Sequence, residues 1–204
     1  MSISYEQTGR TRQKARTRGA LVKAARELLA AGLTPHVEEA AAAAGISRAT
    51  AYRYFPNQRA LLVAAHPEVE AVSLLGDDPP KDPEERLDRT ISEFIRLTID
   101  TEPELRTMLR LSLGAGPKEE LLLRQGRAIG WLKEALAPLG GQLTPKGLRR
   151  LVLAIRSACG IEALVWLTDV ARLSRQEAAE TMRWSALALL RAALAGGEER
   201  QGPA

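Results

Sequence analysis

The sequence is poor in the residues that build disulfide frameworks and metal centres. Its 204 residues include one cysteine, Cys159, and two histidines, His36 and His66. A single cysteine excludes an intramolecular disulfide and a zinc cluster made of cysteines. No HExxH, CxxC or EF-hand pattern is present. We therefore predict no metal and no cofactor. Cys159 is interpreted as a small core residue, with a redox sensor as the less favoured alternative.

Membrane and export signals are also scarce. The N-terminal segment Met1–Glu6 is polar and lacks the apolar stretch of a signal peptide. The most apolar stretch, around residues 151–167, is interrupted by Arg156 and Glu162. We take it as too short and too charged to span a bilayer. We therefore expect a cytoplasmic protein without a membrane partner.

Signatures of catalysis are missing from the sequence. It contains no phosphate-binding glycine loop, no nucleophile motif and no carboxylate cluster with metal spacing. The acidic pairs Glu84-Glu85 and Glu119-Glu120 stand in the first turns of expected helices, where the helix dipole accounts for them. We predict no catalytic residue and no enzymatic activity. A helix-bundle enzyme that binds an anionic substrate through its basic N-terminus is the least favoured alternative.

What the chain does have is a charge imbalance between its two parts. Lys and Arg number 29 against 25 Asp and Glu, a net of +4. Residues 1–60 hold 10 basic and 4 acidic residues, or +6, whereas residues 61–204 hold 19 and 21, or −2. A basic N-terminal quarter on a nearly neutral remainder indicates a module for binding a polyanion.

Helical periodicity dominates the chain and predicts an all-α fold. Helix starts are marked by a capping residue before proline at Thr34-Pro35, Asp82-Pro83 and Thr144-Pro145, and by a capping box at Ser174 with Glu177. The fourth expected helix contains Pro67, which predicts a kink or a split there. The expected helices span about residues 11–31, 35–44, 48–54, 57–75, 83–100, 102–114, 117–137, 145–171 and 175–195.

Residues 34–55 carry the most specific pattern. A short helix with an apolar stripe ends at Gly45, which tolerates the left-handed conformation, and Ser47 is a good cap for the next helix. Helix, glycine turn and capped helix make a helix-turn-helix. On the second helix Ala51 and Phe55 should face inward. Ala49, Thr50, Tyr52 and Arg53 should face outward, with Arg48 and Tyr54 at the edges of that face. This face offers donors and flat rings for phosphates and base edges, although such an aromatic cluster can also be plain packing.

The preceding expected helix is strongly basic and includes Arg12 and Arg16. Such a segment can reach phosphates or a minor groove. The alternative is an ordinary solvated charged face. We favour contact with DNA because the helix-turn-helix follows directly.

The run from Val37 to Leu62 resembles the DNA-binding domain of the TetR/AcrR family of bacterial transcription regulators. The resemblance covers about residues 12–62 and rests on the turn Ala44-Gly45-Ile46-Ser47, on Thr50 and Tyr52, on Tyr54-Phe55-Pro56 and on Leu61-Leu62. It implies a three-helix DNA-binding domain, residues 10–56, followed by a helical domain for ligand binding and dimerisation, residues 57–196.

Several residue roles follow from the resemblance. Ser47, Thr50, Tyr52 and Tyr54 match positions that contact DNA in the family, and Arg48 and Arg53 occupy variable positions that often set sequence preference. Gln58 stands where a lysine is common, and Arg59 beside it can substitute as a phosphate contact. The predicted DNA-binding residues are Arg12, Arg16, Ser47, Arg48, Ala49, Thr50, Tyr52, Arg53, Tyr54, Gln58 and Arg59.

The remaining three quarters of the chain carry weaker signals. A pocket between helices is expected to use Phe94, Met108, Arg110, Trp131, Glu162 and Trp166, each of which can also be plain core or surface. The helix from about residue 145 is apolar nearly all round, which favours a partner subunit on one face. The expected dimer contacts are Leu164, Leu167, Met182, Leu187 and Leu190, with the core of a monomer as the alternative.

The resemblance implies a homodimeric repressor that binds a palindromic double-stranded operator and is released by a small-molecule effector. Its two reading helices would enter major grooves about 34–36 Å apart, or a multiple of that distance. The resemblance also implies that coupling between the domains runs through residues 57–75, where Pro67 can act as a hinge. The main alternative is a dimeric DNA-binding protein that has no small-molecule ligand.

Overall fold

The structure, a computed structural model, describes residues 4–66, 72–114 and 127–196 and confirms an all-helical chain. The chain divides into two compact units. Unit 1 consists of Met1–Val69 and Pro103–Arg124, and unit 2 of Glu70–Glu102 and Gln125–Ala204. Each unit is described by itself below.

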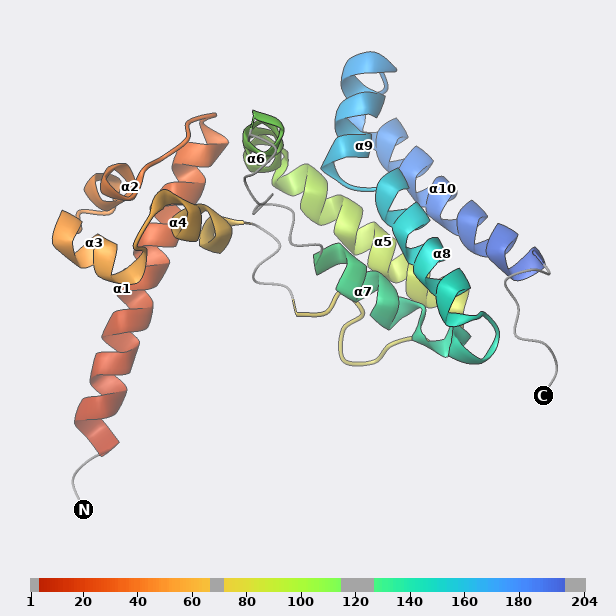
Figure 1. Ribbon diagram of the computed structural model, residues 1–204, viewed down its shortest axis with the longest axis horizontal. Helices are drawn as coiled ribbons and strands as arrows, with labels where there is room; N and C mark the ends of the chain where they lie inside the picture. The colour runs from red at the N-terminus through yellow and green to blue at the C-terminus, as the bar shows by residue number, and fades with distance from the viewer. Residues whose placement is uncertain (1–3, 67–71, 115–126, 197–204) are drawn as a thin grey trace. The chain divides into compact units, whose positions relative to one another are not determined.

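Unit 1 is built from α1 (Ser4–Ala30), α2 (Val37–Ala43), α3 (Arg48–Tyr54), α4 (Gln58–Ala65) and α6 (Glu102–Gly114). Helix α1 packs against α2 and α4, and α2 packs against α3 (Figure 1). The small residues Ala40 and Ala51 are fully buried where these short helices meet. The rest of the core comprises mainly Leu21, Ala25, Leu29, Val37, Ala41, Phe55, Leu61, Leu62, Ala65 and Met108.

Helix α6 completes unit 1 although it follows α4 by almost forty residues. Met108 belongs to the same buried cluster as the residues of α1 to α4. The hydroxyl of Thr107 donates to the Leu29 carbonyl at 3.2 Å, and the Arg110 guanidinium donates to the Gly32 carbonyl at 2.9 Å. The compact unit is therefore larger than the segment 10–56 expected from the sequence, because local patterns do not reveal contacts between distant helices.

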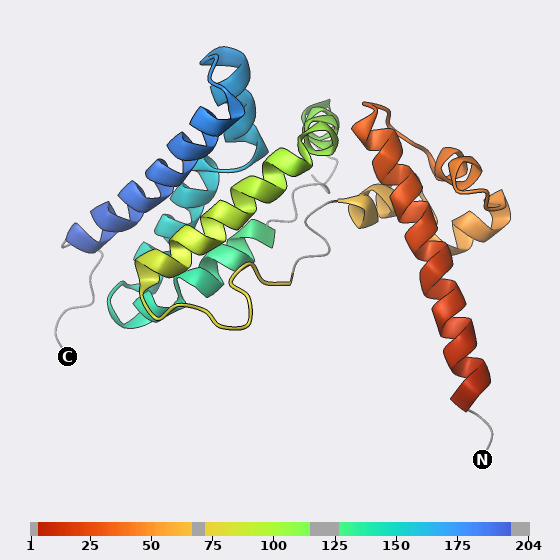
Figure 2. The same cartoon turned by 180° about the vertical axis from the view of Figure 1, so that it is seen from behind.

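Unit 2 contains α5 (Pro83–Asp100), α7 (Arg127–Ala135), α8 (Pro145–Ala158) and α10 (Arg175–Ala195). Helix α10 packs on α5 and α8, and α7 packs on the same two helices, so the four form a closed bundle (Figures 1 and 2). A 3₁₀ turn, η2 (Ala137–Gly141), joins α7 to α8. The interior is filled mainly by Leu87, Ile91, Phe94, Trp131, Leu132, Leu136, Leu143, Leu151, Ile155, Leu164, Met182 and Leu190.

Three of the predicted helix starts are confirmed. The side chains of Asp82, Thr144 and Ser174 accept hydrogen bonds from backbone N–H groups three residues on, at 2.9, 3.1 and 3.2 Å. The predicted start at Thr34-Pro35 is wrong. Helix α2 begins at Val37, and its first turn is closed by Glu39, which accepts the backbone N–H of His36 at 2.6 Å.

The predicted single helix over 145–171 is also wrong. Helix α8 ends before Cys159, and Gly160 has a φ of +102°, a conformation that L side chains rarely adopt. The chain resumes as α9 (Ile161–Val165) and a π-helical turn, η3 (Trp166–Val170). The whole segment Pro145–Val170 is long and apolar enough to cross a membrane by length and composition. The core helix of a water-soluble protein can have the same length and composition.

The expected helix over 57–75 is shorter in the structure. Helix α4 ends at Ala65 and His66 is already extended. The predicted kink at Pro67 lies outside the described residues, as does the first part of the helix expected over 117–137.

Candidate nucleic-acid interface

The turn between α2 and α3 has the geometry that the sequence predicts. Gly45 has a φ of +65°, and the backbone N–H of Ile46 donates to the Ala41 carbonyl at 2.9 Å. The Ser47 hydroxyl oxygen accepts the backbone N–H of Thr50 at 3.3 Å and caps α3. Ser47 also donates its own hydrogen to the Thr50 hydroxyl oxygen at 2.9 Å. The Thr50 hydroxyl therefore keeps its hydrogen for an outside acceptor.

Helix α3 presents two distinct faces. Ala51 is 0% and the following Phe55 2% exposed, and both belong to the core of unit 1. Arg48, Ala49 and Arg53 are exposed on the other side. Thr50, Tyr52 and Tyr54 are half-buried, and the two tyrosines pack against the core while still reaching the surface. The packing and the surface interpretations of the aromatic cluster are therefore both partly correct.

A carboxylate on α2 holds two of the outward residues of α3. The Tyr52 hydroxyl donates to Oε2 of Glu38 at 2.6 Å, and the Arg48 guanidinium lies 3.7 Å from Oε1 of the same carboxylate. Arg48 also stacks over the Tyr52 ring, 5.6 Å from its centre. The hydrogen bond from Tyr52 is the main cause that lowers the pKa of Glu38, and the same bond is the main cause that raises the pKa of Tyr52. Sequence reasoning missed Glu38, since its only signal was an acidic residue in a first helical turn.

The basic residues of α1 divide into two groups. Arg12, Lys14 and Arg16 are exposed, and the first half of α1 extends away from α2, α3 and α4 (Figure 2). Arg18 is exposed too and lies over the Phe55 ring at 5.3 Å. Arg26, by contrast, donates to the Ala65 carbonyl at 3.0 Å and ties α1 to α4. Arg26 therefore has a structural role, whereas Arg12, Lys14 and Arg16 face the solvent.

Gln58 makes hydrogen bonds within unit 1. Its amide nitrogen donates to the carbonyls of Thr34 and Pro35 at 3.3 and 3.2 Å, which anchors the link between α1 and α2. Because a side-chain amide has two hydrogens, both are used within unit 1. The neighbouring Arg59 is exposed at the start of α4.

The expected ligand residues fall in both units. Phe94 and Trp131 meet edge to face with ring centres 6.0 Å apart in unit 2. Arg156, which sequence reasoning missed, lies 5.7 Å over the Phe94 ring and pairs with Glu162 at 3.2 Å. Trp166 is 58% exposed. Met108 and Arg110 lie on α6 and hold unit 1 together, as described above.

The expected dimer residues are mostly interior. Leu164, Leu167, Met182 and Leu190 are buried within unit 2 itself, and Leu187 is half-buried. Sequence alone does not separate the two interpretations, because an apolar helix inside a bundle and one under a partner look alike in sequence. The large apolar side chains that unit 2 does expose on its last helical segments are Leu153, Trp166, Val170 and Trp184, at 45%, 58%, 64% and 69%.

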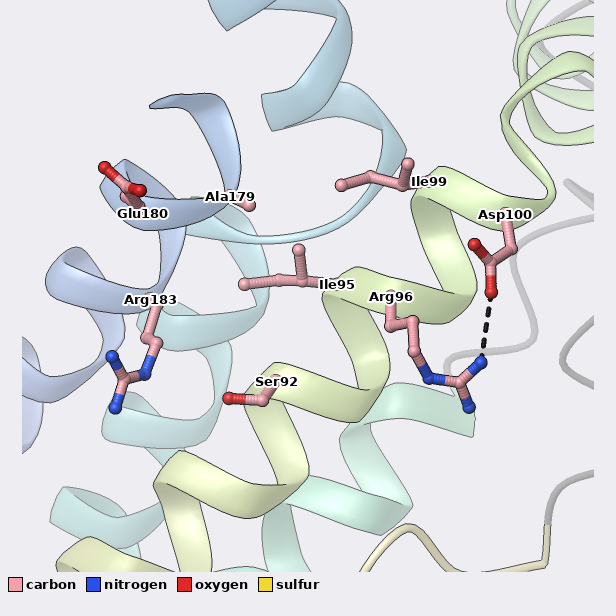
Figure 3. Close-up of a pocket in the computed structure, with 8 residues that line it drawn as sticks. All are labelled: Ser92, Ile95, Arg96, Ile99, Asp100, Ala179, Glu180 and Arg183. Atoms are coloured by element: carbon pink, nitrogen blue, oxygen red, sulfur yellow. Dashed lines mark hydrogen bonds and ion pairs between the residues drawn. The ribbon is translucent and has the colours of Figure 1, made fainter. Parts of the chain in front are cut away.

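Unit 2 also has a groove between α5 and α10 (Figure 3). Its volume is about 340 Å³, and Ile95, Ile99 and Ala179 supply its apolar wall. The charged residues at its edge are paired: Arg96 contacts Asp100 at 3.0 Å, and Arg183 binds Asp88 through two hydrogen bonds. No group of three or more His, Cys, Asp or Glu side chains is placed to hold a metal ion in the described part of the chain.

Comparison with known proteins gives a match for the helix-turn-helix segment. Residues 21–65 match the sequence model of the bacterial regulatory proteins of the tetR family. The fold is similar to a solved TetR transcriptional regulator from Rhodococcus sp. RHA1, with a TM-score of 0.55 and 22% identity over 86% of this chain and 96% of that one. No curated protein matches the chain. Residues 21–65, which include the helix-turn-helix described above, therefore match the tetR family of bacterial regulatory proteins, and the fold of the chain is similar to that of a TetR transcriptional regulator.

Proposed function

We propose that the protein is a homodimeric, ligand-responsive repressor that reads a palindromic operator through α3. The observation that carries this proposal is the outward face of α3, where the exposed Arg48 and Arg53 and the half-buried Thr50 stand on a well-capped helix after a tight turn. Guanidinium and hydroxyl groups are the usual donors to phosphates and base edges. The exposed cations of the first half of α1 add sequence-independent attraction.

The proposed dimer uses the apolar surface of unit 2. Trp184 on α10 and Leu153 on α8 are exposed on two helices that pack side by side. A large exposed tryptophan is uncommon on a monomer and is typical of the centre of an interface. A second copy of the same surface would give the two-fold symmetry that a palindromic operator requires.

The proposed effector site lies in unit 2 around Phe94, Trp131 and Arg156. The Thr90 hydroxyl, one helical turn before Phe94 on α5, is buried without a hydrogen-bond partner. Burying an unpaired hydroxyl costs free energy, which a ligand acceptor or donor would recover. The groove between α5 and α10 is a second candidate, because its volume of about 340 Å³ suits a small molecule.

The two units are joined where α5 runs into α6. Helix α5 carries Thr90 and Phe94, and α6 contributes Thr107 and Met108 to unit 1. A shift of α5 on ligand binding would therefore be passed to α6 through the chain itself. This connection adds to the expected route through residues 57–75.

Selection of duplexes from a random pool, followed by footprinting, tests the DNA proposal. We expect an inverted repeat, protected on two neighbouring major grooves. Absence of duplex binding at every salt concentration would overturn the repressor proposal and leave the enzyme alternative.

The effector proposal is tested by adding a small-molecule extract of cells to the protein–operator complex. We expect release of the DNA, and we expect Phe94→Ala to reduce that release. Loss of the response in Ile95→Trp, which fills the groove, but not in Phe94→Ala would assign the effector to the groove. No release by any extract would favour the alternative of a dimeric DNA-binding protein without a ligand.

A further inference from the structure

Glu38 and a DNA phosphate compete for the same hydrogen of Tyr52. A tyrosine hydroxyl has one hydrogen to donate. In the structure that hydrogen is given to Oε2 of Glu38 at 2.6 Å. To donate to a phosphate oxygen, the Tyr52 hydroxyl must first leave the carboxylate.

The same carboxylate also engages Arg48, so two DNA-facing side chains share one internal anion. Arg48 lies 3.7 Å from Oε1, and its side chain is 72% exposed. The side chain of Glu38 is 41% exposed, so its charge reaches the surface on which DNA would lie. An ionised carboxylate at that surface repels phosphate, whatever the base sequence.

We propose that Glu38 acts as an internal substitute for a phosphate, holding Tyr52 and Arg48 in the free protein and giving both to the DNA backbone on binding. Glu38 thus lowers the affinity for DNA of any sequence. The exchange costs little where a well-placed phosphate replaces the carboxylate. The exchange costs more where the DNA backbone is badly positioned. Glu38 therefore favours a correctly docked operator over random DNA.

This inference rests on the proposed DNA contacts of α3. The following experiment distinguishes a failure of the inference from a failure of those contacts. Binding of a labelled mixed-sequence duplex is measured by fluorescence anisotropy at several salt concentrations. We expect Glu38→Gln to bind about fivefold more tightly than the unmodified protein, the factor that one unit charge about 4 Å from a phosphate contributes in water. Glu38→Ala should give a gain in the same direction.

Glu39→Gln is the matched control. It removes the same charge one residue away, but Glu39 accepts the backbone N–H of His36 and not an outward side chain. Glutamine can make the same capping contact. We expect a clearly smaller gain than for Glu38→Gln.

Tyr52→Phe removes the hydrogen for which the two anions compete. In that background the gain from Glu38→Gln should shrink to the share that comes from Arg48 and from direct repulsion between the carboxylate and phosphate. Weaker binding by both Glu38 variants with unchanged melting temperatures, or a gain no larger than that of Glu39→Gln, would overturn the inference while leaving DNA binding intact. If the unmodified protein binds no duplex, the proposed DNA contacts fail as well.

Discussion

A Cβ atom at Gly160 would lie 2.8 Å from Nη1 of Arg156 and 3.3 Å from Cζ of Phe94. Arg156 uses the same Nη1 to donate to the Cys159 carbonyl and to Glu162, at 2.8 and 3.2 Å. The bend that separates α8 from α9 is thus packed tightly under a half-buried ion pair. Any side chain at Gly160 must displace that pair as well as adopt an unfavourable φ.

Gly160→Ala should therefore destabilise the protein by about 1–3 kcal/mol, the usual cost of a side chain in a sparsely populated backbone region. Urea denaturation followed by circular dichroism measures the change. Gly130→Ala on α7 is the control, because nothing lies within 4 Å of its added Cβ. A helical alanine there should be neutral or stabilising by up to about 1 kcal/mol. Equal effects of the two substitutions would contradict the packing argument.

The thiol of Cys159 should be unreactive in the folded protein. Burial raises the pKa of Cys159 from 9.0 to about 12, and the thiol donates to the Met182 carbonyl at 3.5 Å. Because the thiolate is the reactive form, Ellman's reagent at pH 8 should give a signal only after urea is added. The raised pKa also means that the stability contributed by the buried thiol is full below pH 9.0 and is lost as the pH rises toward about 12. Rapid labelling of the native protein by Ellman's reagent would disprove the predicted lack of thiol reactivity.

Arg53→Ala should relax sequence preference at one position of each half-site. Arg53 is exposed on the outward face of α3, and loss of a two-pronged guanidinium contact to a base costs about 1–3 kcal/mol. Competition between the selected operator and single-base variants measures the preference. Lys133→Ala, on an exposed position of α7, is the control. A uniform loss over all variants would instead identify Arg53 as a phosphate contact.

Replacement of Arg12 and Arg16 by alanine should weaken binding to every sequence. Each phosphate contact that is lost makes the plot of log affinity against log salt shallower by about 0.9. Arg26→Ala is an informative comparison, because that arginine ties α1 to α4. It should lower the melting temperature more than it changes the slope. An unchanged slope in the Arg12 and Arg16 variants would remove the start of α1 from the interface.

Trp184→Glu should convert the proposed dimer to monomers. A tryptophan at the centre of an interface commonly contributes about 2 kcal/mol or more, so the dissociation constant should rise by at least about thirtyfold. Sedimentation equilibrium at several concentrations measures it. Lys133→Glu is the control, because it places a glutamate at an exposed position of another helix, α7. A dimer that survives Trp184→Glu would have to use another surface.

The elements that could be predicted from the sequence are those set by neighbours in the chain. The turn at Gly45, the cap at Ser47 and the starts at Asp82, Thr144 and Ser174 each depend on residues within a few positions, and all were identified correctly. The inward side of α3 could likewise be predicted, because Ala51 and Phe55 are four residues apart and lie on the same face of the helix.

What the sequence did not reveal depends on distant partners. Glu38 meets Tyr52 across 14 residues and Gln58 meets Thr34 across 24, and neither pairing leaves a local pattern. The same holds for the interior leucines of unit 2. Their burial depends on which helices lie beside them, and periodicity cannot distinguish a neighbouring helix from a partner subunit.

The place of α6 in unit 1 has a consequence for synthesis on the ribosome. The bonds from Thr107 to Leu29 and from Arg110 to Gly32 each join residues 78 positions apart. Helices α1 to α4 therefore emerge from the ribosome first. They cannot pack against α6 until the whole of α5, which belongs to unit 2, has been made. During that interval the surface that Met108 later covers is open to water and to other chains, and a nascent helix-turn-helix is at its most vulnerable to misassembly.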